Sequence, residues 1–258
     1  MECLHMSGAG NDFVVLDARD RTMDFSALAK ELCAKTGADG FMAADYSQIA
    51  DFRLHFYNAD GTRGEMCGNG ARCICRFAYE HGFAESTMSI QTDAGIIYGT
   101  RLDESQYRIQ LNNPSIVDLQ RHPDAAYIEL GDPGIPHCVT EYPQLEWSQK
   151  EALRPRFLRL RHAKVFPKGV NVNFYRWLDD RTVRLLTFER GVEDYTLACG
   201  TGSASVATVL WLQGKLPNKH LQVVNAGGTL HITLETQNET VTGLYLEGPT
   251  ELLQTLDI

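Results

Sequence analysis

The feature that most restricts the fold of this chain is a near-repeat of its own sequence. The segment EMCGNGARC (65–73) is answered by LACGTGSAS (197–205), so that Cys67 and Cys199 stand 132 positions apart in 258 residues. The same offset, without a gap, pairs Leu54 with Leu186, Phe56 with Phe188, Gly82 with Gly214, Ala94 and Gly95 with Ala226 and Gly227, and His5 with His137. Self-similarity of this kind predicts two copies of one structural unit.

Each copy predicts the same order of elements. The alternating stretches 51–58 and 184–190 indicate strands, the segments after each Cys-Gly-x-Gly turn have helical spacing, and 88–102 and 221–234 indicate hairpins around an Ala-Gly turn. Further helices are expected over 26–37 and in part of 144–154. The prediction is an α+β fold with two pseudo-symmetric lobes, 1–115 and 116–258, divided near Asn113-Pro114. The prediction allows the last strand to return to the first lobe.

Composition excludes several classes of function. The net charge is −9 without any block of Lys and Arg, which argues against nucleic-acid and anionic-membrane partners. No apolar run is long enough to span a bilayer, and the N-terminal sequence lacks the pattern of a signal peptide, so we expect a cytoplasmic protein. Seven cysteines, an odd number scattered along the chain, are typical of reduced thiols rather than a disulfide framework.

A cysteine directly before a helix has two chemical uses. The unpaired N–H groups and partial positive charge of a helix N-terminus stabilise a thiolate. They also form a site for a small anion, and glycines allow a carboxylate or phosphate to approach the N–H groups closely. Each half of the chain therefore offers a reactive sulfur beside an anion site, at Cys67 and at Cys199.

Less specific interpretations exist for each motif taken singly. A lone cysteine before a Gly-rich turn is often a buried apolar residue, and neither copy completes the G-x-G-x-x-G phosphate motif. The spacing of Cys67, Cys73 and Cys75 does not suit a metal site. A cysteine hydrolase would use one nucleophile with a histidine, for which His5 and His137 are available, and would leave the second cysteine idle. The other five cysteines are taken as structural.

The duplication favours a reaction that needs two like groups. One thiolate can remove a proton from a carbon next to a carboxylate while the opposite thiol returns a proton to the other face, which inverts the centre. Both groups being thiols matches their pKa values. Two helix N-termini would stabilise the developing negative charge. The sequence carries no cofactor motif, so the prediction is a cofactor-independent epimerase of a small-molecule amino acid. A homodimer is compatible with the sequence.

Six stretches together resemble the diaminopimelate epimerase family of cofactor-independent amino-acid epimerases and racemases. They are GAGNDFVVLD (8–17), YNADGTRGEMCGNGARC (57–73), PHC (136–138), GVNVNF (169–174), FERG (188–191) and LACGTGSAS (197–205). The stretches occur in the family's order along nearly the whole chain. The resemblance implies two α/β lobes, each with one principal helix packed in a mostly antiparallel curved sheet, and an active site in the cleft between them.

The resemblance also implies roles for individual residues. Cys67 and Cys199 would be the acid/base pair. Backbone N–H groups at the two helix starts would bind the α-carboxylate, at Gly68, Asn69, Gly200 and Thr201. The other implied substrate contacts are Asn11, Asn58 and Asn171 for polar groups, Glu189 for an ammonium and Arg190 for a carboxylate. From the residues alone, Asn11 and Asn58 equally fit turn positions, and Glu189 and Arg190 fit a solvated strand end.

One departure from the family pattern bears on the substrate. The family's GNPH reads GIPH here (134–137), so Ile135 stands where an asparagine that reads the distal end of diaminopimelate is expected. An apolar side chain cannot replace the hydrogen bonds of the amide. The first expectation is conversion of LL- to meso-diaminopimelate, in lysine and peptidoglycan biosynthesis. The alternatives are a racemase of another amino acid, such as a basic or imidazole one, and a non-catalytic amino-acid-binding protein.

Overall fold

The computed structural model describes residues 2–64 and 67–257, which form two compact units. Residues 65 and 66 of the first cysteine motif lie outside the described residues. The first unit takes in residues up to 110 together with 247–258, and the second covers 111–246. The predicted ranges 1–115 and 116–258 are corrected at the C-terminal end. The chain crosses back because its last strand pairs antiparallel with its first.

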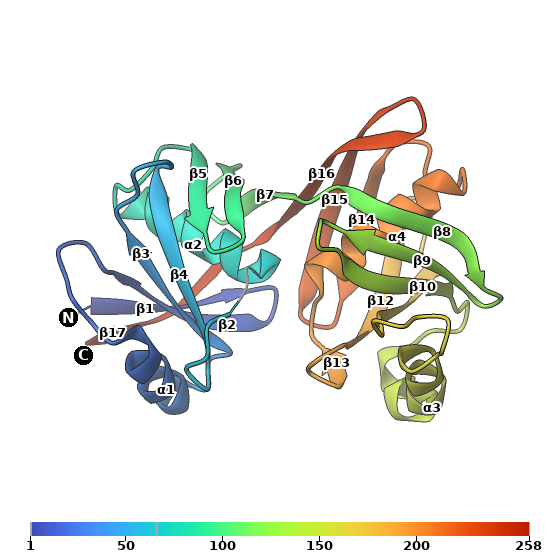
Figure 1. Ribbon diagram of the computed structural model, residues 1–258, viewed down its shortest axis with the longest axis horizontal. Helices are drawn as coiled ribbons and strands as arrows, with labels where there is room; N and C mark the ends of the chain where they lie inside the picture. Colours follow the sequence, from blue (N-terminus) through green and yellow to red (C-terminus); the bar gives the residue numbers. More distant parts are fainter. Residues whose placement is uncertain (1, 65–66, 258) are drawn as a thin grey trace. The chain divides into compact units, whose positions relative to one another are not determined.

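The first unit contains one long mixed sheet (Figure 1). Its strands are β1 (Glu2–Gly8), β2 (Asn11–Asp17), β3 (Gly40–Asp45), β4 (Phe52–Asn58), β5 (Thr87–Thr92), β6 (Gly95–Arg101), β7 (Gln106–Leu111) and β17 (Glu251–Asp257). Hydrogen bonding runs in the order β17-β1-β2-β3-β4-β5-β6-β7, in which β2–β3 and β4–β5 are parallel and the other pairs of known register are antiparallel.

The second unit repeats that arrangement. Its strands are β8 (Pro114–His122), β9 (Ala125–Leu130), β10 (Ile135–Glu141), β11 (Asn171–Trp177), β12 (Thr182–Glu189), β13 (Asp194–Thr196), β14 (His220–Asn225), β15 (Gly228–Gln237) and β16 (Thr240–Pro249), the last of which runs on into the first unit. The order is β8-β9-β10-β11-β12-β14-β15, with β10–β11 and β12–β14 parallel. The short β13 pairs with the end of β12.

The principal helices follow the sequence repeat closely. Helix α2 (Gly68–Glu80) and helix α4 (Gly200–Leu212) each begin directly after a repeated cysteine and have equal length. Both predicted hairpins are also present, as β5–β6 and β14–β15. Each parallel pair in one sheet has its counterpart in the other, so the predicted α+β fold built from two like units is confirmed.

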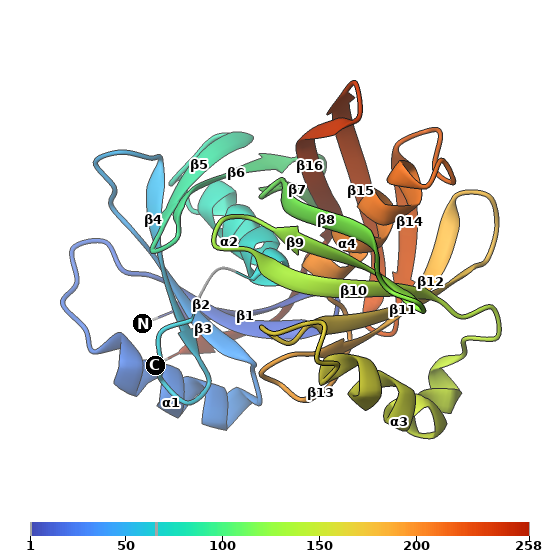
Figure 2. The ribbon, with the colours of Figure 1, turned by 45° about the vertical axis from the view of Figure 1, so that its right-hand side comes forward.

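Each sheet curves around its principal helix (Figure 2). Helix α2 contacts β1, β2 and β3 and also β6, which lies several strands away in the same sheet, so the sheet must bend to bring both to one helix. Helix α4 likewise contacts β9, β10 and β11 on one side and β14 and β15 on the other. Every residue of α4 from Gly202 to Leu210 is buried. A helix that is buried on all sides has no solvent-exposed polar face, which explains why the residues of α4 are mostly small and apolar.

Two further helices cover other parts of the sheets. Helix α1 (Phe25–Thr36) begins at Asp24, which caps the N–H of Ala27, and ends at Gly37 in a left-handed conformation. Helix α3 (Lys150–Arg161) follows a single 3-10 turn over residues 147–149. The helix expected in part of 144–154 is therefore present, and it extends beyond that range to Arg161. No helix in the described part of the chain is long and apolar enough to cross a membrane.

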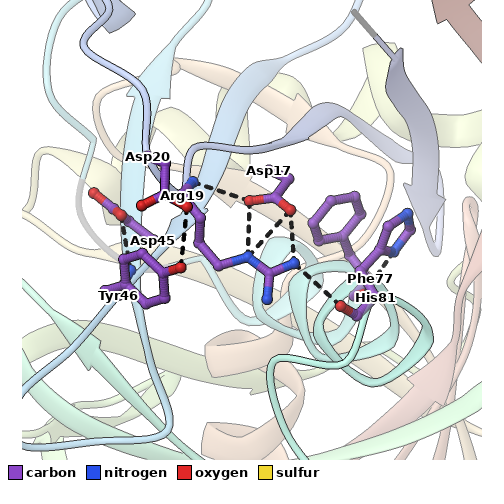
Figure 3. A network of polar contacts seen from close by, with 7 residues as sticks. All are labelled: Asp17, Arg19, Asp20, Asp45, Tyr46, Phe77 and His81. Carbon is purple, nitrogen blue, oxygen red and sulfur yellow. Dashed lines mark hydrogen bonds and ion pairs between the residues drawn. The ribbon is translucent and has the colours of Figure 1, made fainter.

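A polar cluster fixes the C-terminal end of α2 (Figure 3). Arg19, just after β2, forms an ion pair with Asp17 at 2.7 Å and donates to the His81 carbonyl oxygen at 3.3 Å. Its guanidinium carbon also lies 3.7 Å from the centre of the Phe83 ring. The hydroxyl of Tyr46 donates to Asp20, which ties in the chain after β3. One arginine thereby joins the end of a strand to the end of the helix whose start carries Cys67.

Candidate active site

Cys67 is the N-cap residue of α2. Its backbone is extended (φ −106°, ψ 128°), its carbonyl oxygen accepts the Ala71 N–H at 2.8 Å, and its side chain is half-buried. An extended conformation is usual at an N-cap, whose carbonyl oxygen accepts the first intrahelical bond while the N–H groups of the first turn lack intrahelical partners. The sulfur therefore stands beside the positive end of a helix dipole.

A chain of amides lies behind this helix start. The Asn69 amide nitrogen donates to Asn11 Oδ1 at 2.6 Å, and the Asn11 amide nitrogen donates to Asp39 Oδ2 at 2.9 Å. Asp39 also accepts the backbone N–H of Asp12 at 3.1 Å. Two residues that the sequence placed in one site, Asn11 and Asn69, are thus in direct contact. Asp39, which the sequence did not single out, orients both.

The end of β1 packs tightly against the first turn of α2. A Cβ added at Gly8 would lie 2.6 Å from the Asn69 carbonyl oxygen and 3.1 Å from the Cys73 sulfur. No side chain fits there, so the strand backbone comes close to the helix. This approach explains the glycine in GAGND (8–12) and sets the distance between Asn69 and Asn11.

Asn58 lies apart from that cluster. It ends β4 and is exposed, its amide nitrogen donates to the Thr62 hydroxyl at 3.0 Å, and its backbone N–H donates to the Thr62 carbonyl oxygen at 2.9 Å. These bonds close the turn that contains Asp60 and Gly61, where Asp60 accepts the Thr62 N–H. These hydrogen bonds join Asn58 to its own turn, and its implied role in substrate binding stays a prediction.

Cys199 is the N-cap residue of α4, in the same extended conformation (φ −124°, ψ 109°). Its sulfur accepts the Gly202 backbone N–H at 3.3 Å and lies 3.6 Å from the Thr201 hydroxyl. The residue is only 7% exposed. Here the sulfur itself takes the place of the side-chain oxygen that usually caps a helix.

The start of α4 is seated on two polar side chains of the sheet. A Cβ added at Gly202 would lie 2.4 Å from Asn173 Oδ1 and 3.2 Å from the Thr187 hydroxyl. Thr187 donates to Asn173 Oδ1 at 3.0 Å, and Asn173 donates to the Cys138 carbonyl oxygen at 3.0 Å. The glycine of the CGTG turn is thus required by close approach. Asn173 and Thr187 are supporting residues that sequence reasoning missed.

Asn171 and Arg190 are brought together in the second unit. The Arg190 backbone N–H donates to Asn171 Oδ1 at 2.8 Å, and Asn171 donates to the Pro136 carbonyl oxygen at 3.2 Å. Arg190 is exposed, and its guanidinium donates to the Lys168 carbonyl oxygen at 2.9 Å. The backbone contact fixes where the Arg190 side chain leaves the end of β12. Asn171 therefore positions Arg190, whatever else it binds.

Two titratable groups, the half-buried Glu189 and the buried His137, are next to these residues in the sequence. Burial raises the pKa of the Glu189 carboxyl at the end of β12. His137, on β10, is fully buried, and burial, assisted by the charge of Arg190, lowers the pKa of its imidazole to about 3. Asn173 Nδ2 lies 3.1 Å from His137 Nδ1, so that the neutral ring accepts at Nδ1 and carries its proton on Nε2. That Nε2 has no hydrogen-bond partner among the described residues.

Ile135 begins β10 and is 37% exposed. It pairs with Leu130 of β9, one position before the Pro136 carbonyl that Asn171 contacts. The apolar side chain at this place is therefore on the surface of the second unit, close in sequence to His137 and Asn171. Within residues 2–64 and 67–257, no cluster of three or more histidine, cysteine or acidic side chains is arranged to hold a metal ion.

Sequence comparison associates the whole chain with one family. The family model for diaminopimelate epimerase matches residues 3–117 and 131–253. The diaminopimelate epimerase of Chlorobaculum tepidum is 35% identical over 260 residues, covering 95% of this chain and 96% of that protein. The diaminopimelate epimerase of Aquifex aeolicus is 34% identical over 246 residues, covering 88% of each chain.

Solved structures share the fold at low sequence identity. A phenazine biosynthesis protein of the PhzF family from Bacillus anthracis has a TM-score of 0.73 and 15% identity, with 100% of this chain and 98% of that chain covered. A hydroxyproline epimerase from Agrobacterium vitis, solved with trans-4-hydroxy-L-proline, has a TM-score of 0.69 and 15% identity, with 99% and 91% covered. At these identities the likeness concerns the fold alone.

Proposed function

Because the chain belongs to the diaminopimelate epimerase family, and is accordingly an isomerase, we propose that it converts LL-diaminopimelate to the meso form with Cys67 and Cys199 as the two acid/base groups. The observation that carries this proposal is the pair of cysteine N-caps. Two helices of equal length, at equivalent places in two like sheets, each begin at a cysteine in the same extended conformation. A fold that needed only one reactive thiol would have no use for the second.

The reaction is a proton exchange at one carbon. One cysteine, as the thiolate, takes the α-proton, and the electron pair stays on the α-carbon. The other cysteine, as the thiol, gives its proton to the opposite face. Atoms and charge balance without any oxidant or reductant, and in the reverse direction the two cysteines exchange roles. The proposal requires that both sulfurs reach one α-carbon.

The carbanion is the difficult species, and the helix starts address it. The N–H groups of Gly68 and Asn69 in α2, and of Gly200 and Thr201 in α4, lie at the positive ends of helices of thirteen residues. An α-carboxylate bound there would have its developing negative charge stabilised by donors that are already in place. The seating of Gly202 on Asn173 and the contact of Asn69 with Asn11 keep these donors fixed.

The polar residues of the second unit suit the remaining groups of the substrate. Arg190 offers a planar fork of donors for a carboxylate, and Asn171 fixes its backbone. Glu189 is a half-buried carboxyl whose raised pKa would fall again when an ammonium group binds beside it. In the first unit, Asn11 has its amide held by Asp39, and Asn58 is assigned to the same polar contacts by family resemblance alone.

Ile135 supports a second candidate, a racemase of another amino acid with the same two-cysteine chemistry. An exposed apolar side chain stands where the family pattern has an amide, so one of the hydrogen bonds to the distal amino-acid group of diaminopimelate is missing. A substrate with a basic or imidazole side chain would tolerate this change better than one with a second amino-acid centre.

A deuterium-exchange panel tests both candidates. The protein is incubated in D2O with LL- and meso-diaminopimelate, lysine, arginine, histidine and proline, and α-deuterium is followed by NMR. We expect exchange into diaminopimelate at rates at least about 100-fold above those for any single-centre amino acid, because buried polar groups left unpaired penalise the wrong substrate strongly. Exchange into another amino acid, with none into diaminopimelate, would select the racemase. Binding of diaminopimelate with no exchange at all would contradict both.

A matched variant isolates the effect of the missing amide. Replacing Ile135→Asn restores the family's residue at the start of β10, where the side chain is exposed and the strand register with Leu130 is unaffected. For a diaminopimelate epimerase we expect a lower KM for diaminopimelate and little change in kcat, because the new contact is far from the reacting carbon. The exposed Ile116→Asn on β8 serves as the control.

A further inference from the structure

Helix α2 carries a fully buried arginine for which the reaction just described has no use. Arg72 has no exposed surface, although its guanidinium is charged at all physiological pH values. In the α4 repeat the equivalent residue is Ala204, which is also buried. One difference between the two cysteine-capped helices is therefore a fully buried positive charge in α2 that α4 lacks.

The guanidinium folds back toward the start of its own helix. Nη1 donates to the Gly68 carbonyl oxygen at 3.3 Å and Nη2 donates to Asn69 Oδ1 at 3.0 Å, and both of these residues directly follow Cys67. Nε has no hydrogen-bond partner among the described residues. A cation at the N-terminal end of a helix is opposed by the helix dipole, so this placement is unfavourable unless a negative charge is nearby.

No carboxylate supplies that charge within residues 2–64 and 67–257, where Arg72 takes part in no ion pair. The titratable groups on the elements packed against α2 are Glu2, Cys3 and His5 on β1, Asp12 and Asp17 on β2, Asp45 on β3, and Tyr98 and Arg101 on β6, with Asp39 directly before β3. Two of these carboxylates already have partners, since Asp12 lies 3.6 Å from His5 and Asp39 accepts from Asn11.

Burial lowers the pKa of the Arg72 guanidinium. Among the described residues, the acidic groups whose charges oppose that shift are the sulfurs of Cys73, Cys67 and Cys75, which lie in α2 or at its N-cap. Cys73 and Cys75 are fully buried, and burial raises the pKa of Cys73 to about 12 and that of Cys75 further, so both stay neutral thiols. Of these three sulfurs, Cys67, which is half-buried at the N-cap, is the one placed to carry a negative charge.

We propose that Arg72 is the buried counter-ion of a Cys67 thiolate, so that the resting protein holds its base at Cys67 and its acid at Cys199. Arg72 is thereby a positioning residue that acts through Cys67 and does not touch substrate. This inference rests on the proposed two-cysteine function and adds to it a resting proton distribution. The first proton is removed by Cys67, and Cys199, whose helix has alanine at the matching place, starts as the thiol.

Alkylation of the two cysteines as a function of pH tests the proposal without using turnover. The folded protein is treated with iodoacetamide between pH 5 and 10, and the rate at each cysteine is read from its peptide by mass spectrometry. We expect a lower pH midpoint for Cys67 than for Cys199 in the unmodified sequence. A midpoint for Cys67 equal to or above that of Cys199 would overturn the proposal, and this arm needs no variant.

Three variants assign the effect to the arginine. Arg72→Met keeps most of the side-chain volume and removes the charge, which buried sites often tolerate. We expect the Cys67 midpoint to rise by about 1 to 3 pH units, with Cys199 unchanged, and Arg72→Lys to restore most of the shift. Arg76→Met, one turn later in the same helix and paired with Glu80, is the matched control and should shift neither midpoint.

Other outcomes separate the alternatives. A folded Arg72→Met protein with an unchanged Cys67 midpoint but a raised KM would mean that Arg72 serves the bound carboxylate, and the proposal fails. A lower melting temperature with no shift would mean a purely structural role, which also overturns it. Failure of the deuterium-exchange panel alone, with the midpoint shift present, would reject the epimerase function and leave the Arg72–Cys67 pairing in place.

Discussion

The starts of α2 and α4 have the same extended cysteine N-cap, but different residues hold each helix start in place. Around Cys67 the support is polar, because Asn69, Asn11 and a buried Arg72 stand behind the helix. Around Cys199 the helix is apolar, and its first turn rests on Asn173 and Thr187 of the sheet. Duplication therefore preserved the position of each sulfur at a helix N-terminus, while the side chains that surround each helix start diverged.

The largest effect is expected from removing either sulfur. Cys67→Ser and Cys199→Ser should each lower kcat for epimerisation by about 10²- to 10⁴-fold, the usual contribution of a positioned acid or base. Turnover is measured by the loss of optical activity or by coupled α-deuterium exchange. The buried Cys73→Ala is the control and should keep most of the activity. Near-normal epimerisation by either serine variant would contradict the proposal that both cysteines act as acid/base groups.

Adding a methyl group in the first turn should destabilise the protein by different amounts in α4 and in α2. Gly202→Ala places a Cβ 2.4 Å from Asn173 Oδ1, whereas Gly70→Ala in α2 meets the Met42 sulfur and the Phe13 ring at 3.3 Å. Overpacking of the first kind costs about 1 to 3 kcal/mol, and the second should cost less because the neighbours need to move only slightly. Chemical denaturation measures both changes. Equal destabilisation would mean that the two helix starts are seated alike.

The buried imidazole of the second unit should make stability fall at acid pH. His137 has a pKa of about 3 in the folded protein and an ordinary value near 6.5 when unfolded. Above pH 6.5 both states are neutral and nothing changes. Between about pH 6 and pH 4 only the unfolded state binds the proton, so the free energy of unfolding should drop by about 1.4 kcal/mol per pH unit.

His137→Gln should remove that part of the slope in urea melts at several pH values. His122, on β8 of the same unit and in partial contact with solvent, provides the matched substitution. An unchanged slope in His137→Gln would show that other groups dominate the acid sensitivity.

The smallest effect is expected at the far end of α2. Arg19→Met removes the ion pair with Asp17 and the bond to the His81 carbonyl oxygen but leaves an apolar chain over Phe83. A loss of about 1 kcal/mol in the free energy of unfolding is expected, from one partly exposed hydrogen-bonded contact. The kcat should be unchanged because the helix start is held separately by Asn69 and Asn11. A large loss of kcat would mean that the position of α2 along its axis controls Cys67.

How far the sequence could predict this protein differs between its parts. The offset between the cysteines placed both helices and both hairpins, because a turn of glycines and a period of apolar residues are local signals. The helix expected in part of 144–154 begins there but continues through Pro155 to Arg161, a continuation that was not predicted from the sequence. The sequence left open whether residues 247–258 return to the first unit, because the pairing of β17 with β1 joins residues from the two ends of the chain.

The duplicated fold, the family and the position of the two cysteines at helix starts could all be predicted from the sequence, because each follows from neighbouring residues or from the internal repeat. The residues that surround each sulfur became known only from the tertiary structure. Asp39 reaches Asn11, Asn173 reaches Gly202, and Arg72 loses all contact with solvent, through strands distant in sequence. Burial and hydrogen-bond partners set the charge on a thiol, and no local pattern encodes them.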